Sequence, residues 1–599
     1  MPRTTVGSVL VNSALPPDLR DYHRILDKGN TRELARQLAE LHPRTYADVM
    51  RRLHELGWYM AYRQNATLRL SDLKTPVIKR KLMSKLDEEL RAVRTDAERV
   101  AVLEKFVPIL QDTIYEDALK RDNSLAHQVK AGSRGNPAQL STLLGSDLIS
   151  YDHKMRPIPL PIRNSYAEGL TPQEYWAGSY DTRRGEIATK FATPKAGFFG
   201  KQLAMAAHRL VVTSDKISTK DSDVGLLLEP TEDMLGYVLA RHAGNMPAGT
   251  VVTPDVLARL RKRGKKVLVH SVICDRQPRG ISAAAAGVRE RGRLPSVGEN
   301  IGVTAAQAYA ERLSQSQLNV KNQGGDAAYT GFDFINRLAQ VPKVFPGAAS
   351  VAESDGSVTR IEPAKQGGTY VYINGDQHYV PAEREVTVKV GSKVEAGDVL
   401  SDGIPSPAVV AKYKGVGAGR LNFARRFHEA FQRAGMHVHP RNSELVARAL
   451  VNHVRMREPI GNWLPDDIVE YDALAAAWKP RDGAETVQAS RVRPGGYLEM
   501  PVLHYSIGTR ITPTVAKEIR ESGVDLVHKH TEPPPFDVEM VRLMDNPAKT
   551  DDWMARMGAF NLRRSTTEAV QRGRTADIHG TSFVPGLAIG TEFGKGRPY

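Results

Sequence analysis

The sequence predicts a multidomain α+β protein, on three observations. At 599 residues the chain is too long for one hydrophobic core, so we expect about three to five structural units. Two tracts, at about 30–125 and 171–212, carry apolar residues at helical spacing. Residues 350–412 instead alternate apolar and polar residues between Gly/Asp turns, which is typical of a β-rich module.

The first part of the chain is predicted to be mainly helical. Residues 1–20 are expected to form a short strand and a Pro-terminated linker. Residues 21–125 are expected to form a long helical hairpin, with breaks at Gly57 and at Thr75-Pro76. This hairpin is too polar for a buried bundle, so we expect it to project into solvent.

A second long helix is predicted at 171–212, after a loop-rich segment at 126–170. Thr171 can serve as its N-cap and Glu174 as the capping-box partner. Pro194 lies inside this tract, where it removes one backbone hydrogen bond and should kink or loosen the helix.

The rest of the chain mixes helices and strands. Two segments, 249–272 and 508–530, share one pattern: a strand, a helix that starts at Thr-Pro, and a second strand. The repetition indicates recurring small α/β elements. The predicted segments are a mixed α/β segment at 213–296, a helical region at 297–345, a β-rich module at 346–415, and a helical and mixed region at 416–599.

Composition narrows the function classes. The formal charge of +15 favours a polyanionic partner, although an ordinary basic protein is the alternative. Cys274 is the only cysteine, which excludes an internal disulfide and a Cys-rich zinc site. No stretch approaches the ~20 apolar residues of a membrane span, and the N-terminus makes a poor signal peptide. We therefore expect a soluble, intracellular protein.

Several phrases resemble the β′ (largest) subunits of multisubunit DNA-directed RNA polymerases, in that family's order. AGSRGNPAQL at 131–140 is similar to the F-loop, which braces the active site. YDTRRGEIATKFATPKAGFFGKQL at 180–203 is similar to the bridge helix, and GENIGVTAAQAYAERLSQSQLNVKNQGG at 298–325 to the segment that carries the trigger loop. Similar phrases at 4–16, 164–176, 391–403 and 565–574 extend the resemblance over nearly the whole chain.

The family's Mg²⁺-binding loop, NADFDGD, is missing from this sequence. The resemblance therefore implies the C-terminal half of a split β′ subunit, as in giant (jumbo) bacteriophages, with Mg²⁺ bound by a partner chain. The implied partners are the DNA template, the RNA transcript, nucleoside triphosphates, a β′ N-terminal-type chain that carries the catalytic aspartates, and β-type chains, with no membrane. The implied location is the cytoplasm of an infected bacterium, or the virion.

The trigger-loop resemblance implies roles for three residues. Leu318 falls where the family packs a side chain on the incoming base, and Asn319 where it contacts the sugar or phosphates of the nucleotide. Asn322 falls where the family has a His that was proposed as a general acid. Because an amide cannot donate a proton at neutral pH, the loop would act here by closure and orientation. The alternative is that 302–322 is simply a packed amphipathic helix.

The bridge-helix resemblance implies nucleic-acid contacts. Thr193 and Pro194 fall where the family has a small pair that faces the templating base pair, and Pro194 departs from the family pattern. Basic side chains along the tract would contact phosphates of template or hybrid, with solvated surface charge as the alternative for each: Arg183, Arg184, Lys190, Lys195 and Lys201. In the F-loop match, Arg134 and Gln139 would hydrogen-bond the closed trigger loop, or the loop would merely brace the bridge helix.

The structural zinc site of bacterial β′ is expected to be lost. Cys274 lies in a phrase similar to the family's zinc segment, but Ile281 and Ala284 occupy the later cysteine positions. We therefore expect no zinc, and Cys274 as a small buried hydrophobic residue.

Two other functions compete with a polymerase subunit. The chain could be an inactive nucleic-acid-binding accessory protein that kept the fold, which Pro194 and Asn322 would favour. A structural phage protein is the other, but it leaves the ordered phrases unexplained. A self-sufficient nucleotidyltransferase is excluded because the metal ligands are missing.

Overall fold

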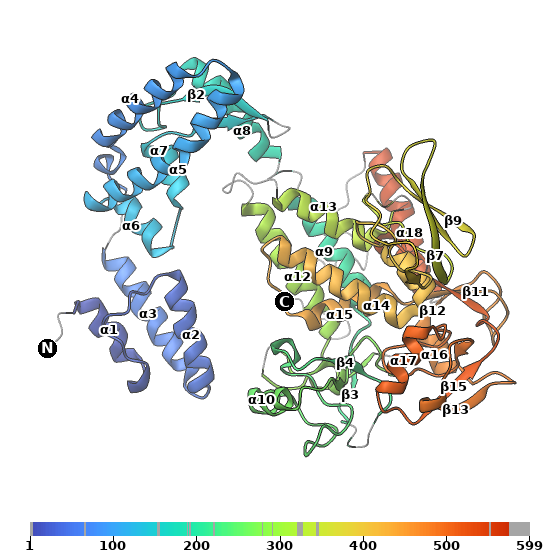
Figure 1. The fold of residues 1–599 in the computed structure, drawn as a ribbon. Helices are drawn as coiled ribbons and strands as arrows, with labels where there is room; N and C mark the ends of the chain where they lie inside the picture. The colour runs from blue at the N-terminus through green and yellow to red at the C-terminus, as the bar shows by residue number, and fades with distance from the viewer. Residues whose placement is uncertain are drawn as a thin grey trace. The chain divides into compact units, whose positions relative to one another are not determined.

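The chain forms two compact units in the computed structural model, one from residues 1–191 and the other mainly from 192–319 and 327–599 (Figure 1). None of the helices in the described part of the chain is long and apolar enough to cross a membrane. The structure describes residues 4–64, 68–152, 156–187, 190, 193–217, 219, 222–277, 280–289, 292–319, 327–342, 345, 347–549 and 553–573.

The first unit is mostly helical. An antiparallel pair of strands, β1 and β2, precedes its last helix. Its elements are α1 (Val6–Ala14), α2 (Lys28–Leu41), α3 (Tyr46–Gln64), α4 (Val77–Ala92), α5 (Asp96–Lys120), α6 (Ser124–Ala131), α7 (Pro137–Leu144), β1 (Leu148–Tyr151), β2 (Pro157–Ile162) and α8 (Pro172–Ile187).

The strand predicted within residues 1–20 is wrong, because Val6–Ala14 form the helix α1. The hydroxyl of Thr5 accepts a hydrogen bond from the amide of Ser8 at 3.2 Å and caps this helix. Leu15 follows the helix and packs with Leu34 and Leu38 of α2 in one apolar cluster. The cap and this contact outweigh the β propensity of the local valines.

The tract at 21–125 is helical as predicted, but it is four helices rather than one long hairpin. α1, α2 and α3 share one apolar cluster, whereas α4 and α5 belong to a second cluster with α6 and α7. The break predicted at Thr75-Pro76 is confirmed, since α4 begins at Val77. Gly57 instead lies inside α3, where a single glycine costs only about 1 kcal/mol.

The second unit combines a helical core with small sheets. Its first part contains α9 (Thr193–Ala207), β3 (Val212–Ser214), β4 (Leu226–Leu228), α10 (Pro254–Arg263), β5 (Val267–Val269), β6 (Ile281–Ser282), α11 (Ala283–Ala286), α12 (Ile301–Asn319) and α13 (Ala327–Gln340). β3 pairs with β6 in parallel, and β4 pairs with β5 in antiparallel register.

The predicted β-rich module is confirmed. Strands β7 (Gly356–Pro363), β8 (Thr369–Ile373), β9 (Asp376–Val380) and β10 (Lys393–Val394) form an antiparallel sheet in the order β10-β7-β8-β9. Alternate side chains of this sheet, among them Val358, Val371 and Val380, build a separate small core. The mixed α+β class predicted from the sequence is therefore correct.

The C-terminal part adds the rest of the helical core and two three-stranded sheets. The sheets have the orders β12-β11-β16 and β13-β15-β14. The elements are α14 (Pro407–Arg433), α15 (Pro440–Leu450), β11 (His453–Met456), β12 (Ile468–Glu470), α16 (Tyr471–Ala477), β13 (Glu485–Gln488), β14 (Tyr497–Leu498), α17 (Pro513–Glu521), β15 (Leu526–His530), β16 (Phe536–Glu539) and α18 (Trp553–Gln571).

The two related phrases fold into matching elements, as predicted. α10 and α17 each begin with proline after a threonine whose hydroxyl caps the helix, Thr253 in one copy and Thr512 in the other. Each helix leads into a strand, β5 or β15. Just before each helix the chain forms one isolated antiparallel β-bridge, between Val238 and Val251 in the first copy and between Tyr497 and Arg510 in the second.

Candidate functional site

Two helices in the second unit pack against each other without intervening side chains. A Cβ atom on Gly200 of α9 would lie 2.5 Å from the Cβ of Ala310 on α12. A Cβ atom on Gly302 of α12 would lie 2.1 Å from the carbonyl oxygen of Ala207 on α9. Distances this short leave no room for a methyl group, so the sequence of small residues sets how closely these helices approach.

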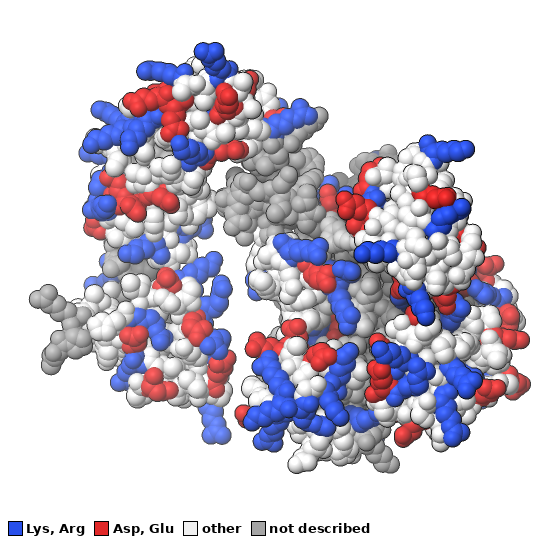
Figure 2. Space-filling view, viewed as in Figure 1, with Lys and Arg blue, Asp and Glu red and all other residues white. Residues whose placement is uncertain are grey.

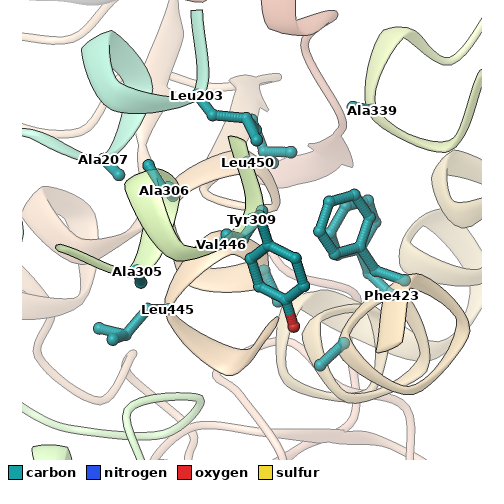
Figure 3. Packing of buried hydrophobic residues seen from close by; sticks show 14 of the residues in the cluster. Leu203, Ala207, Ala305, Ala306, Tyr309, Ala339, Phe423, Leu445, Val446 and Leu450 are labelled. Carbon is teal, nitrogen blue, oxygen red and sulfur yellow. The ribbon is translucent and has the colours of Figure 1, made fainter. Parts of the chain in front are cut away.

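The opposite side of α12 is fixed in a core of aromatic and aliphatic residues. Tyr309 is fully buried, and its ring centroid lies 5.0 Å from that of Phe427 and 4.6 Å from that of Phe431. Figure 3 shows Tyr309 between α14, which carries Phe423, and the α15 residues Leu445, Val446 and Leu450. Burial raises the pKa of the Tyr309 hydroxyl, so the side chain stays neutral.

α13 packs on the same helix, α9. The rings of Phe199 on α9 and Phe332 on α13 meet edge to face, with centroids 6.0 Å apart. The amide of Gln340 at the end of α13 donates a hydrogen bond to Gln202 of α9 at 3.2 Å. α9 therefore holds both helices that flank residues 320–326.

Two of the three predicted trigger-loop residues lie at the far end of α12. Leu313 is buried, and the exposed Gln315 donates a hydrogen bond to Glu311 at 3.0 Å. Leu318 and Asn319 are the last two residues of the helix, but their side chains lie outside the described part of the chain. Asn322 lies outside the described residues altogether.

The effect predicted for Pro194, a kinked or loosened helix, stays a prediction, because residues 188–189 and 191–192 before it lie outside the described part of the chain. Pro194 is the second residue of α9, within the first turn, where the missing N–H would have had no helical partner. The tract predicted as one helix at 171–212 is described as α8 and α9, and α9 ends at Ala207. The capping box at the start of α8 is confirmed, since Thr171 and Glu174 exchange hydrogen bonds of 2.9 and 3.3 Å.

One side of α9 is open. Pro194, Lys195 and Lys201 are exposed, and a Cβ atom on Gly197 would meet no atom within 4 Å among the described residues. Phe198 is also exposed, at 57%. Sequence reasoning missed Phe198, although the adjacent Phe198-Phe199 pair on a helix signals that only one ring can enter the core.

Of the other predicted bridge residues, Arg183, Arg184 and Lys190 belong to the first unit and Thr193 to the second. Lys190 is exposed, and the Arg183 guanidinium lies 6.0 Å from the ring centroid of Tyr180. The side chains of Arg184 and Thr193 lie outside the described residues, the latter at the start of α9. Phosphate contacts by these side chains stay predictions.

The F-loop-like segment at 131–140 leads into α7. Asn136 caps α7 by accepting a hydrogen bond from the amide of Gln139 at 2.8 Å, and Arg134 is exposed beside it. Further along, the hydroxyl of Ser150 donates to the carbonyl of Ala177 on α8 at 3.1 Å. This contact comes from β1, beyond residues 131–140, so both the bracing of the bridge helix and the contacts of Arg134 and Gln139 with the trigger loop stay predictions.

The residues around Cys274 do not fit a structural zinc ion. Ile281 and Ala284 are buried apolar residues and offer no ligand, while the Cys274 thiol donates to the carbonyl of Ser271 at 3.7 Å. The Asp275 carboxylate accepts hydrogen bonds from the amide and hydroxyl of Ser282 at 2.7 and 3.2 Å. These contacts join Cys274 to Ser271 and Asp275 to Ser282 through hydrogen bonds.

In the parts of the chain that the structure describes, no group of three His, Cys, Asp or Glu residues could hold a metal ion. The α9–α12–α13 site therefore offers helix ends, exposed basic groups and an exposed aromatic ring, but no metal-ligand set. Such a site can position a ligand and contact phosphate groups.

Comparisons with known proteins identify the region. Residues 169–366, which span α8 to β7, match the family model described as RNA polymerase Rpb1, domain 5. The chain is similar to proteins named DNA-directed RNA polymerase subunit beta' from Clavibacter michiganensis subsp. michiganensis, 28% identical over 76% of this chain and 38% of the relative. The protein of the same name from Symbiobacterium thermophilum is 25% identical over 76% of this chain and 42% of the relative. That from Desulforudis audaxviator is 26% identical over 78% of this chain and 44% of the relative.

The matched part thus spans about two fifths of the length of these relatives and about three quarters of this chain. The family-model match and these relatives together support the prediction that the chain corresponds to a C-terminal region of a β′-type subunit of DNA-directed RNA polymerase.

Proposed function

We propose that this chain supplies the bridge helix and the trigger loop of a multisubunit DNA-directed RNA polymerase. The bridge helix would comprise α8 and α9, and the trigger loop would be residues 320–326 with the adjoining ends of α12 and α13. The observation that carries the proposal is the packing of α9 against both α12 and α13, with the close approach at Gly200 and Gly302.

This arrangement supports a positioning role. α12 is fixed by Tyr309 and by its contact with α9, so residues at its end would move relative to a stiff base. Leu318 would pack on the base of the incoming nucleotide and Asn319 would hydrogen-bond its sugar or phosphates. Alignment of reactants can remove on the order of 7–11 kcal/mol of a barrier, so closure of such a loop is a sufficient contribution.

Proton donation is not part of the proposed role. The position that would face the leaving phosphates carries Asn322, whose amide can donate a hydrogen bond to a phosphate oxygen but cannot release a proton. The chain would therefore orient the triphosphate while the RNA 3′ hydroxyl attacks the α-phosphate in line.

The catalytic Mg²⁺ ions would be bound by aspartates of a partner chain. In polymerases, paired metal ions stabilise the attacking and leaving oxygens of such a displacement. The donor groups of this chain do not fit that task, because its described residues form no group of three metal-ligating side chains. We further propose that the subunit is split as in giant bacteriophages, and that β-type chains complete the enzyme with DNA, RNA and nucleoside triphosphates.

The trigger-loop assignment is tested by substitution in the assembled enzyme. Leu318→Ala with Asn319→Ala should slow nucleotide addition about 10²-fold, the scale expected for misplaced reactants, while the partner chains still copurify. Gln315→Ala is the matched control, because Gln315 is exposed one turn earlier on α12 and bonds only Glu311 among the described residues. An unchanged elongation rate in the double variant would overturn the assignment.

The subunit assignment has its own test. Affinity purification of the tagged chain from cells that express it should recover a chain with the NADFDGD motif and β-like chains by mass spectrometry. Recovery of a single chain that binds DNA but adds no nucleotides would instead favour the inactive accessory protein.

A further inference from the structure

α10 carries a dense group of basic side chains away from the α9–α12–α13 site. Its residues 259–266 read RLRKRGKK, with six basic residues in eight. All six are exposed, and Figure 2 shows the blue patch that they form over α10, at the lower left of the second unit. We call this set, Arg259, Arg261, Lys262, Arg263, Lys265 and Lys266, the α10 basic patch.

The patch rests on a rigid base. Leu257 and Leu260 of α10 are buried in an apolar cluster with Met234, Tyr237 and Val269. The helix ends at Gly264, which adopts the left-handed conformation with φ +62°. The basic groups therefore project from a fixed surface, which reduces the entropy lost when they bind a ligand.

Acidic neighbours leave most of the charge uncompensated. Arg261 lies 3.8 Å from Glu232 and Lys266 lies 4.0 Å from Glu229, and both acids are well exposed. Exposed pairs of this length contribute little. In the described part of the chain, no carboxylate is within ion-pair distance of the other four members, Arg259, Lys262, Arg263 and Lys265.

The related helix α17 shows that the fold does not need this charge. Its buried positions Ala516 and Ile519 correspond to Leu257 and Leu260, and it has the same threonine cap. Its outward groups are compensated, since Lys517 lies 4.0 Å from Glu521 and Arg520 donates to the carbonyl of Val492 at 2.7 Å. The same local structure thus forms with mixed charge.

The helix dipole explains only part of the patch. Cations in the last turn gain about 0.3–1 kcal/mol each at a helix C-terminus, which applies to Arg261, Lys262 and Arg263. Lys265 and Lys266 follow the helix end, and Arg259 and Arg263 are four residues apart, a spacing at which like charges repel. The dipole therefore does not account for Arg259, Lys265 and Lys266, and the related helix α17 forms without such a basic group, so a ligand is the explanation that we pursue.

We propose that the α10 basic patch binds the phosphate backbone of duplex nucleic acid. Arginine and lysine neutralise phosphates and release counterions without reading the bases. Residues 259–266 include no Phe, Tyr or Trp, and single strands are held largely by stacking on aromatic rings. The patch therefore fits a duplex, and duplex DNA is the form that a polymerase subunit meets, a choice that rests on the proposed function.

The test compares two variants of the chain with its copurifying partners. In the patch variant, Arg259→Gln, Lys262→Gln, Lys265→Gln and Lys266→Gln remove four charges while Arg261, which donates to the carbonyl of Pro230, is kept. The control variant removes four exposed charges elsewhere: Lys365→Gln, Lys389→Gln, Lys393→Gln and Lys517→Gln. The affinities for a duplex DNA of about 30 base pairs and for a single-stranded RNA are measured from low to moderate salt concentration.

For duplex DNA, log affinity falls as log salt concentration rises, with a slope of up to ~0.9 per phosphate contact. In the patch variant this fall should be less steep, and the magnitude of the slope should decrease by about 2–4. The control variant should keep the slope of the unmodified protein. Equal losses in both variants, no loss in either, or a loss for RNA alone would overturn the proposal. So would loss of a partner chain with an unchanged DNA slope, which would indicate a protein contact. Nucleotide addition by preformed elongation complexes reports separately on the proposed function.

Discussion

Gly302 of α12 faces the backbone of Ala207 so closely that its missing Cβ atom would lie 2.1 Å from the Ala207 carbonyl oxygen. The same helix pair meets again where Gly200 faces Ala310. Both helices are also buried on other sides, α9 through Phe199 and α12 through Tyr309. A side chain at Gly302 therefore cannot be accommodated by a small rotation of either helix.

Gly302→Ala should destabilise the second unit. Overpacking of a close-packed interior costs about 1–3 kcal/mol, and here the obstacle is backbone rather than a flexible side chain. Urea unfolding of the purified chain measures the change. Gly197→Ala is the control on α9, where a Cβ atom meets nothing within 4 Å in the described chain, so stability should hold or rise by up to about 1 kcal/mol. Equal destabilisation of the two variants would contradict the packing argument.

Asp472→Asn should destabilise the core strongly at neutral pH. Asp472 lies 3.1 Å from Arg420 and 3.3 Å from Arg448, and both arginines are almost completely buried. Removal of one partner from a buried ion pair costs about 3–5 kcal/mol, because the remaining charges lose their compensation. Denaturant unfolding at pH 7 measures this loss. Asp466→Asn is the control, since Asp466 is 89% exposed and should contribute little.

The same pair of variants gives a pH test. Burial alone would raise the pKa of Asp472, but Arg448 and Arg420 outweigh it and hold the pKa below its ordinary value. A carboxylate with a lowered pKa contributes stability above its unfolded pKa of about 4, and that contribution is lost as the pH falls through the folded value. The difference between the unmodified protein and Asp472→Asn should therefore shrink below about pH 4. A constant difference would show that the charge is not its cause.

Periodicity and turn residues predicted the broad fold because they act locally. The Thr-Pro starts of α10 and α17 and the alternation in β7–β9 each depend on neighbours within a few residues. The strand predicted near Val6 failed because a cap at Thr5 and a contact with α2 decide that segment. The sequence could not decide the role of Pro194, because a proline that interrupts one helix is also a favoured residue in the first turn of another, and Pro194 lies in the first turn of α9.

The candidate site was predicted by resemblance at the level of segments and not at the level of contacts. Sequence order indicated that α9 and α12 matter, but the pairing of Gly200 with Ala310 joins positions about a hundred residues apart in the chain. No local pattern reveals such a pairing, because the neighbouring sequence does not distinguish a helical glycine that faces solvent from one that faces another backbone. Gly197 and Gly200 on α9 show both cases within one turn.

Cys274 should react slowly with thiol reagents in the folded chain. Cys274 is half-buried rather than fully buried as predicted, and desolvation, together with the charges of Asp275 and Glu444, raises the pKa of its thiol to about 12. The thiolate is the reactive form. Because Cys274 is the only cysteine, modification of the intact chain by iodoacetamide can be followed directly by mass spectrometry. The same chain in guanidinium chloride is the control and should be modified rapidly. Equally fast modification of the folded chain would contradict this prediction.

His453→Leu should make the protein less sensitive to mild acid. His453 is 2% exposed in β11, and neither ring nitrogen has a hydrogen-bond partner among the described residues. Burial, with the charge of Arg209, lowers its pKa to about 3, whereas an unfolded His has a pKa of about 6.5. Between these values the unfolded chain binds the extra proton, so stability falls as the pH drops below about 6.5. The unmodified protein should lose about 2 kcal/mol more than His453→Leu between pH 7 and pH 5 in urea unfolding. His23→Leu, at an exposed position, should keep the original slope, and an unchanged slope in His453→Leu would show that this ring does not titrate on unfolding.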